Sequence, residues 1–235
     1  MKVGTFVKTS SPQVVEMLAL AGMHFIVVDA EHAPFDRRDI DLLVLAGRAT
    51  GLPVIVRVAD MTASTILSTL DLGAAGLLVP HVDSAAQAEE LVARTRCRGG
   101  RRGFSSATRA AGYGTLGMED ALRSVDRCFV MAQIESAAAV QAAPEIAAVQ
   151  GIDGLFIGRA DLALSFGETN ARSTRVLDAT DGVLRATRAA HKVAGMAVGS
   201  AAERDEFAAK GANWFVVGSD QSLLRQAAAA VAAPG

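Results

Sequence analysis

The sequence has few of the residues that build disulfide scaffolds or membrane spans. Its two cysteines, Cys97 and Cys128, lie far apart without a CxxC spacing, so neither a disulfide framework nor a zinc knuckle is expected. No apolar run approaches the roughly 20 residues that cross a membrane. The start of the chain, MKVGTFVKTSSP, has no continuous apolar segment of a signal peptide. We therefore expect a cytoplasmic protein without a membrane partner.

An excess of charge of one sign is also missing, and lysine is scarce. The formal net charge is −2 and the pI is about 6.1, with basic residues spread along the chain, which favours a small-molecule substrate and argues against a nucleic-acid partner. Lys2, Lys8, Lys192 and Lys210 are the only lysines, and only Lys8 directly follows a predicted strand. A Schiff-base mechanism needs a desolvated lysine in the pocket, so we do not expect one.

What the sequence does contain is a regular series of short apolar runs. They cover residues 3–7, 24–29, 53–57, 75–80, 128–135, 153–158, 195–199 and 213–218. Helical patterns lie between them, with start signals such as Ser11-Pro12 and the capping-box spacings Ser84-x-x-Gln87 and Ser200-x-x-Glu203. Buried strands that alternate with helices are typical of a parallel sheet covered by helices. Eight such units in 235 residues predict a single (β/α)₈ TIM-barrel domain over residues 1–235.

Polar side chains gather at the carboxyl ends of the predicted strands. They are Asp29, Glu31, His32, Arg57, Gln133, Glu135 and Asp161. Taken alone, each has a structural explanation: Glu135 or Asp161 could serve a helix N-terminus, Arg57 could form a structural ion pair, and His32 could be a buried histidine. Because the carboxyl ends of barrel strands share one mouth, their common position predicts an active site.

The donors available at this mouth favour a hard metal ion. Glu135 and Asp161 follow neighbouring strands, no cysteine is close in the predicted fold, and only His32 and His81 among the histidines are expected at the mouth. Carboxylate oxygens suit Mg²⁺ or Mn²⁺ that keeps waters or substrate oxygens. A zinc site with two or three histidines is not expected.

Seven stretches, taken together, are similar to one enzyme family. They are VVDAEHAPFD, PVIVRV, LDLGAAGLLVPHVD, RGFSSATRAAGYG, AQIES, DGLFIGRADLALSFG and VVGSD. In this order and over nearly the whole chain, the set resembles the HpcH/HpaI aldolase/citrate lyase family, and within it the class II, metal-dependent pyruvate aldolases of the 4-hydroxy-2-oxo-heptane-1,7-dioate aldolase type. The resemblance implies a lyase that reversibly cleaves 4-hydroxy-2-oxo acids to pyruvate, or a related 2-oxo acid, and an aldehyde through a metal-bound enolate.

The resemblance also implies a cofactor, an assembly and a substrate site. The cofactor would be Mg²⁺, Mn²⁺ or Co²⁺, with Glu135 and Asp161 as its ligands. Gln133, Gly158 and Ala160 would contact the substrate, and the backbone N–H groups around Ala160 and Asp161 would bind the pyruvate carboxylate. The enzyme would be a homo-oligomer, usually a hexamer, whose last helix is exchanged between subunits.

The catalytic roles follow from the same resemblance. Arg57 would hold the keto oxygen and stabilise the enolate, while Asp29 and His32 would form the pair that exchanges a proton with the 4-hydroxyl. Asp71, in LDLGAAG, matches a family acid near the site. The chemistry agrees, because retro-aldol cleavage leaves an electron pair that a metal and an arginine can stabilise, and a histidine oriented by a carboxylate suits the proton transfer.

Some features leave alternatives open. Arg159 stands where many relatives carry proline, and it could contact a substrate carboxylate or pack at a subunit boundary. Residues 97–117 form a long segment rich in glycine and arginine, in which Arg101, Arg102 and Arg109 could bind an acidic tail or be solvated. Two other functions compete: a CoA-thioester lyase of the citryl or malyl type, for which the chain is short, and a non-catalytic barrel that binds a metal or a 2-oxo acid.

Overall fold

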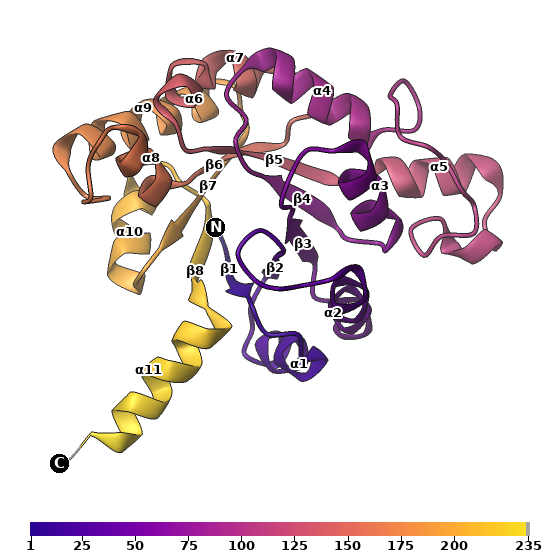
Figure 1. Ribbon diagram of the computed structural model, residues 1–235, viewed down its shortest axis with the longest axis horizontal. Coiled ribbons are helices and arrows are strands. Elements are labelled where there is room, and N and C mark those ends of the chain that lie inside the picture. Colours follow the sequence, from indigo (N-terminus) through magenta and orange to yellow (C-terminus); the bar gives the residue numbers. More distant parts are fainter. Residues whose placement is uncertain (234–235) are drawn as a thin grey trace.

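The eight predicted strands form a closed parallel barrel. In the computed structural model, which describes residues 1–233, the strands pair in chain order and β8 returns to β1 (Figure 1). They are β1 (Lys2–Val7), β2 (Phe25–Asp29), β3 (Val54–Arg57), β4 (Gly76–Val79), β5 (Phe129–Ile134), β6 (Gly154–Ile157), β7 (Val193–Val198) and β8 (Trp214–Ser219). The fold is therefore a single-domain (β/α)₈ barrel, as the sequence predicts.

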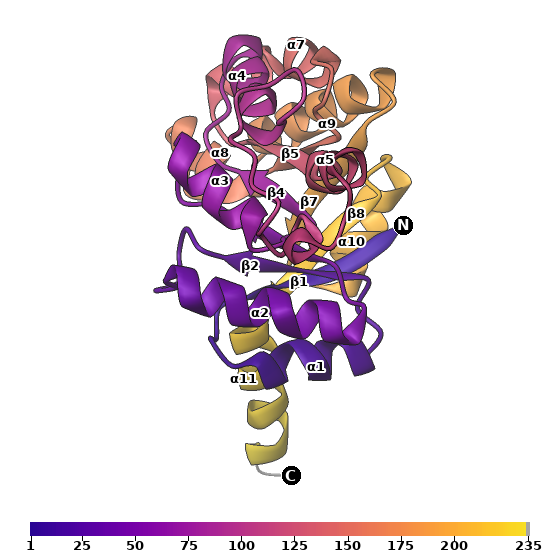
Figure 2. The same cartoon turned by 90° about the vertical axis from the view of Figure 1, so that its right-hand side faces the viewer.

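Helices connect the strands and cover the outside of the barrel (Figures 1 and 2). They are α1 (Pro12–Leu20), α2 (Arg37–Thr50), α3 (Ala63–Asp71), α4 (Ala85–Thr95), α5 (Met118–Asp126), α6 (Ala137–Gln141), α7 (Ala143–Ala148), α8 (Arg159–Ser165), α9 (Thr174–Ala189), α10 (Ala201–Ala209) and α11 (Asp220–Ala232). A short 3₁₀ turn, η1 (Gly112–Gly114), lies within the segment between α4 and α5. No helix in residues 1–233 is both long enough and apolar enough to cross a membrane.

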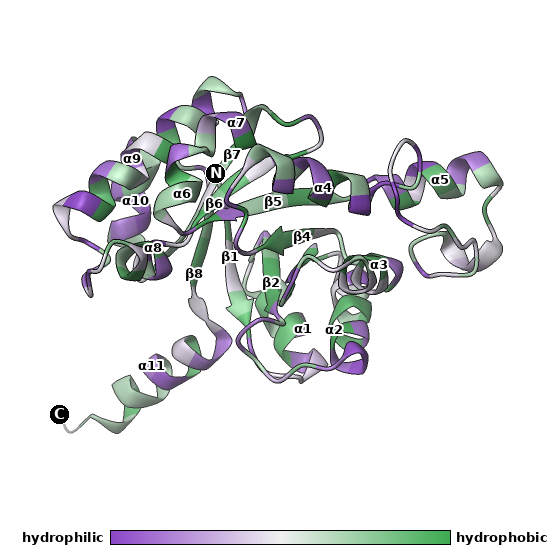
Figure 3. Cartoon of the chain, turned by 45° about the horizontal axis from the view of Figure 1, so that its top comes forward, coloured by the Kyte–Doolittle hydropathy of each residue, from purple (hydrophilic) through white to green (hydrophobic). Residues whose placement is uncertain are grey.

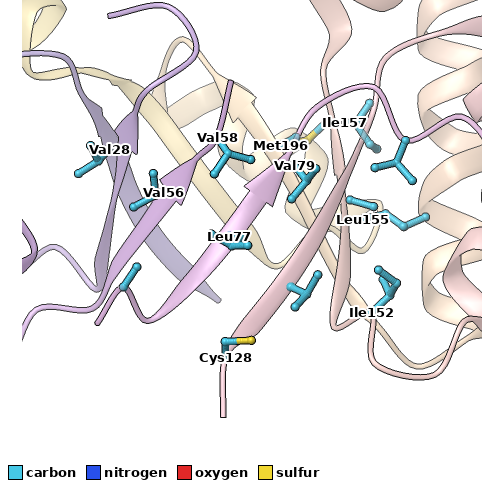
Figure 4. Close-up of a cluster of buried hydrophobic side chains, with 14 of the residues drawn as sticks. Val28, Val56, Val58, Leu77, Val79, Cys128, Ile152, Leu155, Ile157 and Met196 are labelled. Atoms are coloured by element: carbon cyan, nitrogen blue, oxygen red, sulfur yellow. The ribbon is translucent and has the colours of Figure 1, made fainter. Parts of the chain in front are cut away.

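Alternation along the strands divides the core into two parts. Val28 and Val56 point outward and pack with the helices, whereas Val27 and Ile55 point into the barrel. Figure 4 shows part of the outer layer, and Figure 3 shows the apolar strands at the centre of the molecule. Each strand is buried on both faces, which is why its sequence reads as an almost continuous apolar run.

Aromatic rings fill the barrel interior near the amino ends of the strands. Phe25 and Trp214 are the first residues of β2 and β8, and their rings stack with centroids 3.8 Å apart. Phe156 meets the Trp214 ring edge-on at 5.9 Å. This packing occupies the interior at the floor, so the polar residues can gather only at the opposite end, which we call the mouth.

The predicted helix starts are confirmed, but the capping bonds differ in detail. The Ser84 and Ser200 hydroxyls accept the backbone N–H groups of Gln87 and Glu203, as in a capping box. In a capping box the side chain three residues after the cap would accept the N–H of the capping residue itself. Here the Glu203 side chain accepts the N–H of Gly199, the residue before the cap, at 2.7 Å. Ser11 precedes α1 as predicted, yet its side chain makes no capping bond.

The last helix, α11, points away from the barrel (Figures 1 and 2). Apolar side chains on this helix are exposed to solvent: Leu224 is 72% exposed and Val231 is 88% exposed. Its first residue, Asp220, is instead buried against the chain after β1 and accepts the backbone N–H groups of Lys8 and Thr9, both at 3.0 Å. The base of the helix is therefore fixed to the barrel, while most of its length is unpacked in a single chain.

The absence of a side chain at Gly76 should allow the close approach of β4 to β5. A Cβ added at Gly76 would lie 2.3 Å from the carbonyl oxygen of Phe129. We expect Gly76→Ala to lower the free energy of unfolding by about 1–3 kcal/mol, because the backbone itself must move. Urea denaturation measures this, with Gly103→Ala as the control, since a Cβ there meets nothing within 4 Å. Equal stability of both variants would contradict the packing described.

Candidate active site

The mouth of the barrel carries polar side chains that are almost completely buried. Asp29 is fully buried, and Arg57, Gln133 and Glu135 are 7%, 2% and 3% exposed. They come from the carboxyl ends of β2, β3 and β5, or directly follow them. Charged groups buried to this degree must be paired or bind a ligand. The structure thus brings these predicted site residues to one place.

Asp29 is held by two cations from neighbouring strands. Register between β2 and β3 sets Asp29 opposite Arg57, whose Nε donates to Oδ1 at 2.9 Å and whose Nη2 donates to Oδ2 at 2.8 Å. The Lys8 ammonium, after β1, lies 2.9 Å from Oδ2. Burial alone would raise the pKa of Asp29, but the bonds to Arg57 and Lys8 outweigh it, so the pKa is lowered. Asp29 is an anion at neutral pH.

His32 meets Asp29 through its backbone and meets Glu31 through its ring. The His32 N–H donates to Asp29 Oδ1 at 3.2 Å, while its Nε2 lies 3.4 Å from Glu31 Oε2. The His32 side chain is 53% exposed at the rim of the mouth. The predicted Asp29–His32 pair is therefore close in space, but the carboxylate beside the imidazole belongs to Glu31.

Glu31 is a largely buried acid, and its buried oxygen Oε2 lacks a hydrogen bond within residues 1–233. That oxygen, Oε2, lies 3.3 Å from Arg57 Nε, but the Nε hydrogen points to Asp29. Burial raises the pKa of Glu31, the charge on Glu135 adds to the rise, and the nearby Arg57 and histidines only partly offset it. Glu31 is thus the carboxyl group at the mouth whose ionised form is disfavoured.

Glu135 is fixed by hydrogen-bond donors on both sides. Its Oε1 accepts the backbone N–H of His81 at 2.8 Å and lies 3.0 Å from His81 Nδ1, while Gln133 Nε2 donates to Oε2. His81 has a left-handed φ of 57°, an uncommon conformation that directs its N–H to the carboxylate. Gly158 lies against the same group, since a Cβ there would be 3.0 Å from Glu135 Oε2.

Asp161 and Ala160 are exposed in the first turn of α8, directly after Gly158. Within residues 1–233 no three or more His, Cys, Asp or Glu side chains form a preassembled metal site. A site with Glu135 and Asp161 as its only protein ligands would therefore need further oxygens from water or substrate. The buried Gln133 Oε1, which lacks a hydrogen-bond partner in the described residues, is one polar atom near Glu135 available to such a ligand.

Asp71 is not brought to the mouth. It is the last residue of α3, which leads to the amino end of β4, and so lies at the floor of the barrel. Its carboxylate accepts a hydrogen bond from the buried Arg102 at 2.7 Å. In a single chain, the position of Asp71 therefore departs from the expectation of an acid near the other site residues.

The segment 97–117 also lies at the floor, because it connects α4 to α5 and β5. Arg102 donates to the carbonyl of Val125 as well as to Asp71, and Arg109 donates to Asp41 and to the carbonyl of Leu72. Arg101 pairs with Glu90. These arginines hold the segment against the outside of the barrel, through contacts with α2, α3, α4 and α5.

Arg159 is buried beside the mouth, between β7 and α10. Its Nη2 donates to the carbonyl of Ala197 at 3.1 Å and to Glu203 at 2.8 Å. Its guanidinium lies 4.7 Å from the centre of the Phe207 ring. One edge of Arg159 therefore has a structural role.

Sequence reasoning gave no role to Glu31 or His81, although both belong to this cluster. Glu31 stands between Asp29 and His32, in the stretch that follows β2, and His81 follows Pro80 after β4. Position after a strand was the available signal for both residues. The sequence does not indicate that the Glu31 carboxyl group lies beside the His32 ring, or that the backbone N–H of His81 donates to Glu135.

The fold and the mouth together define a barrel enzyme, because acid, base and cationic groups converge where the strands end. The chain belongs to the HpcH/HpaI aldolase/citrate lyase family, whose model matches residues 2–227. A crystal structure of a family member from Burkholderia cenocepacia J2315 superposes with a TM-score of 0.93 at 32% identity, covering 98% of this chain and 92% of the other.

Curated relatives carry aldolase names. A hydroxypyruvate/pyruvate aldolase of Deinococcus radiodurans is 35% identical over 99% of this chain and 84% of its own length. A 2-keto-3-deoxy-L-rhamnonate aldolase of Klebsiella pneumoniae is 34% identical over 96% of this chain and 85% of its own length. The chain is therefore a carbon–carbon lyase, an aldolase of this family. This assignment favours the aldolase over both the CoA-thioester lyase and the non-catalytic barrel.

Replacing Glu31 with glutamine should change how stability depends on pH. Because the folded-state pKa of Glu31 is raised above its ordinary value of 4.5, its contribution to stability is present below that value and is lost as the pH rises through the folded-state pKa. We expect Glu31→Gln to gain stability relative to wild type between pH 4.5 and pH 8. Urea unfolding of metal-free protein at several pH values measures the difference.

Glu145→Gln, at an exposed carboxylate on α7, is the matched control and should show no such gain. If the stability difference between Glu31→Gln and wild type stayed constant over this pH range, Glu31 would titrate alike in the folded and unfolded chains. The burial effect assigned to it would then be wrong.

Proposed function

We propose that this aldolase reversibly cleaves 4-hydroxy-2-oxo acids to pyruvate, or a related 2-oxo acid, and an aldehyde with the help of a divalent metal ion. The observation that carries the proposal is the buried cluster in which Asp29, Arg57 and Glu31 lie beside the exposed ring of His32 and near Glu135. A cation for the keto oxygen and a base for the hydroxyl proton are the two groups that retro-aldol cleavage requires.

Glu135 and Asp161 are the residues that would hold the metal ion. The surroundings of Glu135 fit such a role, because Gly158 leaves room that a Cβ would fill and Gln133 Oε1 is buried without a partner in the described residues. An all-oxygen donor set suits Mg²⁺, Mn²⁺ or Co²⁺. When bound, the ion supplies positive charge that polarises the keto group of the substrate.

Arg57 would stabilise the negative charge that develops on the keto oxygen. Its Nε and Nη2 are occupied by Asp29, whereas Nη1 makes no hydrogen bond within residues 1–233 and is left for a substrate oxygen. Because Asp29 fixes the plane of the guanidinium, Arg57 needs little reorganisation during the reaction. The exposed backbone around Ala160 and Asp161 would bind the carboxylate of the 2-oxo acid.

His32 would accept the proton of the 4-hydroxyl group. As that proton leaves, the bond between C3 and C4 breaks, C4 becomes the aldehyde carbon, and the electron pair is delocalised onto the keto oxygen as an enolate. Protonation at C3 then gives the methyl group of pyruvate. The Glu31 carboxyl group, 3.4 Å from the ring, would orient the imidazole, and Asp29 would hold the loop through the His32 N–H.

We infer that the native enzyme is a homo-oligomer, a hexamer in which α11 is exchanged between subunits. The exposed apolar residues of α11, Leu224 and Val231, support this inference, because the apolar side of a helix that packs on little of its own chain can be buried against another chain. The fixed base of the helix at Asp220 would set the direction in which it reaches the neighbour.

Exchange of the pyruvate methyl protons in D₂O tests the proposed chemistry. Proton NMR should show metal-dependent exchange by wild-type enzyme that is lost after EDTA treatment and restored by Mg²⁺, Mn²⁺ or Co²⁺. Glu135→Gln should reduce the exchange rate by at least about 100-fold, since it removes a ligand charge. Glu145→Gln, an exposed carboxylate on α7, should exchange like wild type.

Exchange that persists without metal would overturn the metal-dependent mechanism and turn attention to Lys8. Absence of exchange under every condition would remove the enolate chemistry, and with it this proposal. A further arm measures cleavage of a 4-hydroxy-2-oxo acid with a coupled assay for pyruvate, which must follow the same dependence on metal and on Glu135.

The assembly has its own test in α11. Light scattering after size-exclusion chromatography should give wild-type protein the mass of a hexamer. The double variant Leu224→Asp, Val231→Asp should yield smaller species, because two buried carboxylates would oppose packing of the helix on a neighbour. A monomeric wild type, or a double variant with an unchanged mass, would count against exchange of the helix.

A further inference from the structure

A hollow at the mouth lies beside the proposed site, at the carboxyl ends of β1, β6, β7 and β8. It has a volume of about 420 Å³ and is lined by small and apolar residues together with Lys8 and Arg159. Among residues 1–233, Lys8 and Arg159 are the charged residues that line it, and both are cations. A hollow of this size accepts a small organic group, and its charge favours an anion.

Arg159 has hydrogen-bond donors to spare. It is 9% exposed, and its Nε and Nη1 are buried without a hydrogen-bond partner in residues 1–233. Its Nη2 is anchored to Ala197 and Glu203, so the guanidinium is held in place while its other N–H groups are left unused. A buried, anchored arginine whose other N–H groups lack a partner calls for a further acceptor, and a ligand in the neighbouring hollow could supply one.

Lys8 contributes the second cation from the other side of the hollow. Its ammonium lies 2.9 Å from Asp29, and its side chain is 26% exposed. An ammonium has three N–H donors, so the ion pair with Asp29 leaves donors for another partner. Lys8 therefore links the proposed catalytic cluster to the hollow.

The acids nearby do not face into the hollow. Asp29, Glu203 and Asp220 are not among its lining residues. Glu203 accepts bonds from Arg159, Arg172 and the N–H of Gly199, and Asp220 accepts the N–H groups of Lys8 and Thr9. Their carboxylates are thus turned to protein donors, and the surface offered to a ligand is cationic.

The hollow adjoins the proposed site for the 2-oxo acid. Ala160, which precedes Asp161, lines it, and so does Phe6, whose ring lies 4.5 Å from the Arg57 guanidinium. A substrate whose keto-acid half lies at Arg57 and Asp161 can therefore extend into the hollow with its other half. That other half is the part released as the aldehyde.

We propose that Arg159 and Lys8 bind an anionic group, a carboxylate or a phosphate ester, at the far end of the aldehyde fragment. This inference rests on the proposed function and adds the class of the second substrate. An arginine forms paired hydrogen bonds to either anion, and a lysine adds a point charge. The enzyme should therefore prefer aldehydes with an anionic tail to neutral aldehydes of similar size.

Aldol addition of pyruvate to matched aldehydes tests the preference in the metal-loaded enzyme. The carboxylate arm compares 4-oxobutanoate with butanal, and the phosphate arm compares glyceraldehyde 3-phosphate with glyceraldehyde. In at least one arm, kcat/KM for the anionic aldehyde should exceed that for the neutral one by about tenfold or more, and the arm that shows it identifies the anion. Added salt should reduce the preference.

Substitutions then assign the preference to residues. Arg159→Gln should lower the ratio of kcat/KM between the anionic and neutral aldehydes about tenfold, mainly through KM for the anion. Lys8→Met is a second variant for the same ratio, should Arg159→Gln fail to fold. Arg172→Gln is the matched control, because Arg172 also pairs with Glu203 but does not line the hollow, and its ratio should equal that of wild type.

Three results bear on this inference and on the proposed function on which it rests. If wild-type enzyme exchanges pyruvate methyl protons but shows no preference for either anionic aldehyde, the anion site is wrong and the aldolase proposal stands. A preference that survives in every folded variant of Arg159 and Lys8 also overturns the assignment. If no exchange occurs at all, both proposals fall together.

Discussion

The ion pair between Asp29 and Arg57 is the constraint on which the mouth of this barrel depends. Two buried charges are costly unless each is fully paired, and here the register of β2 and β3 sets them side by side, with Lys8 completing the arrangement from β1. Asp29 takes the Nε and Nη2 hydrogen bonds of Arg57, so Arg57 acts on Glu31 as a nearby charge, with Nε 3.3 Å from Glu31 Oε2. Glu31 is left as the acid that resists ionisation next to His32. One pairing thus sets the charge state of its neighbours.

The two ends of the barrel have different structural roles. Stacked aromatic rings fill the interior at the floor, and arginine pairs hold the long segment 97–117 beneath it. At the mouth, the side formed by β2 to β5 carries Arg57 among carboxylates and histidines, whereas the hollow at the ends of β6, β7, β8 and β1 is lined by Lys8, Arg159 and small or apolar residues. An elongated substrate with distinct ends would meet two different chemical environments within one opening.

Much of this arrangement could be predicted from the sequence, and the limits have physical causes. Strands buried on both faces read as apolar runs, so the barrel and the gathering of Asp29, Arg57 and Glu135 at strand ends followed directly. Side-chain partners did not, because adjacent residues such as Glu31 and His32 have several possible directions in a loop. Asp71 shows the other limit: its position in α3 sends it to the floor, which motif matching alone does not reveal.

The closure of β1 against β8 has a consequence for how the chain reaches this state. The backbone N–H groups of Lys8 and Thr9 donate to Asp220, more than two hundred residues later in the chain. One edge of β1 pairs with β8, the last strand. As the chain leaves the ribosome, the first strand is therefore an open edge until almost the last residues have emerged, and edges of this kind attract wrong partners. Such long-range pairing also slows folding. The ammonium that completes the Asp29 cluster acquires its final surroundings only at the end of synthesis.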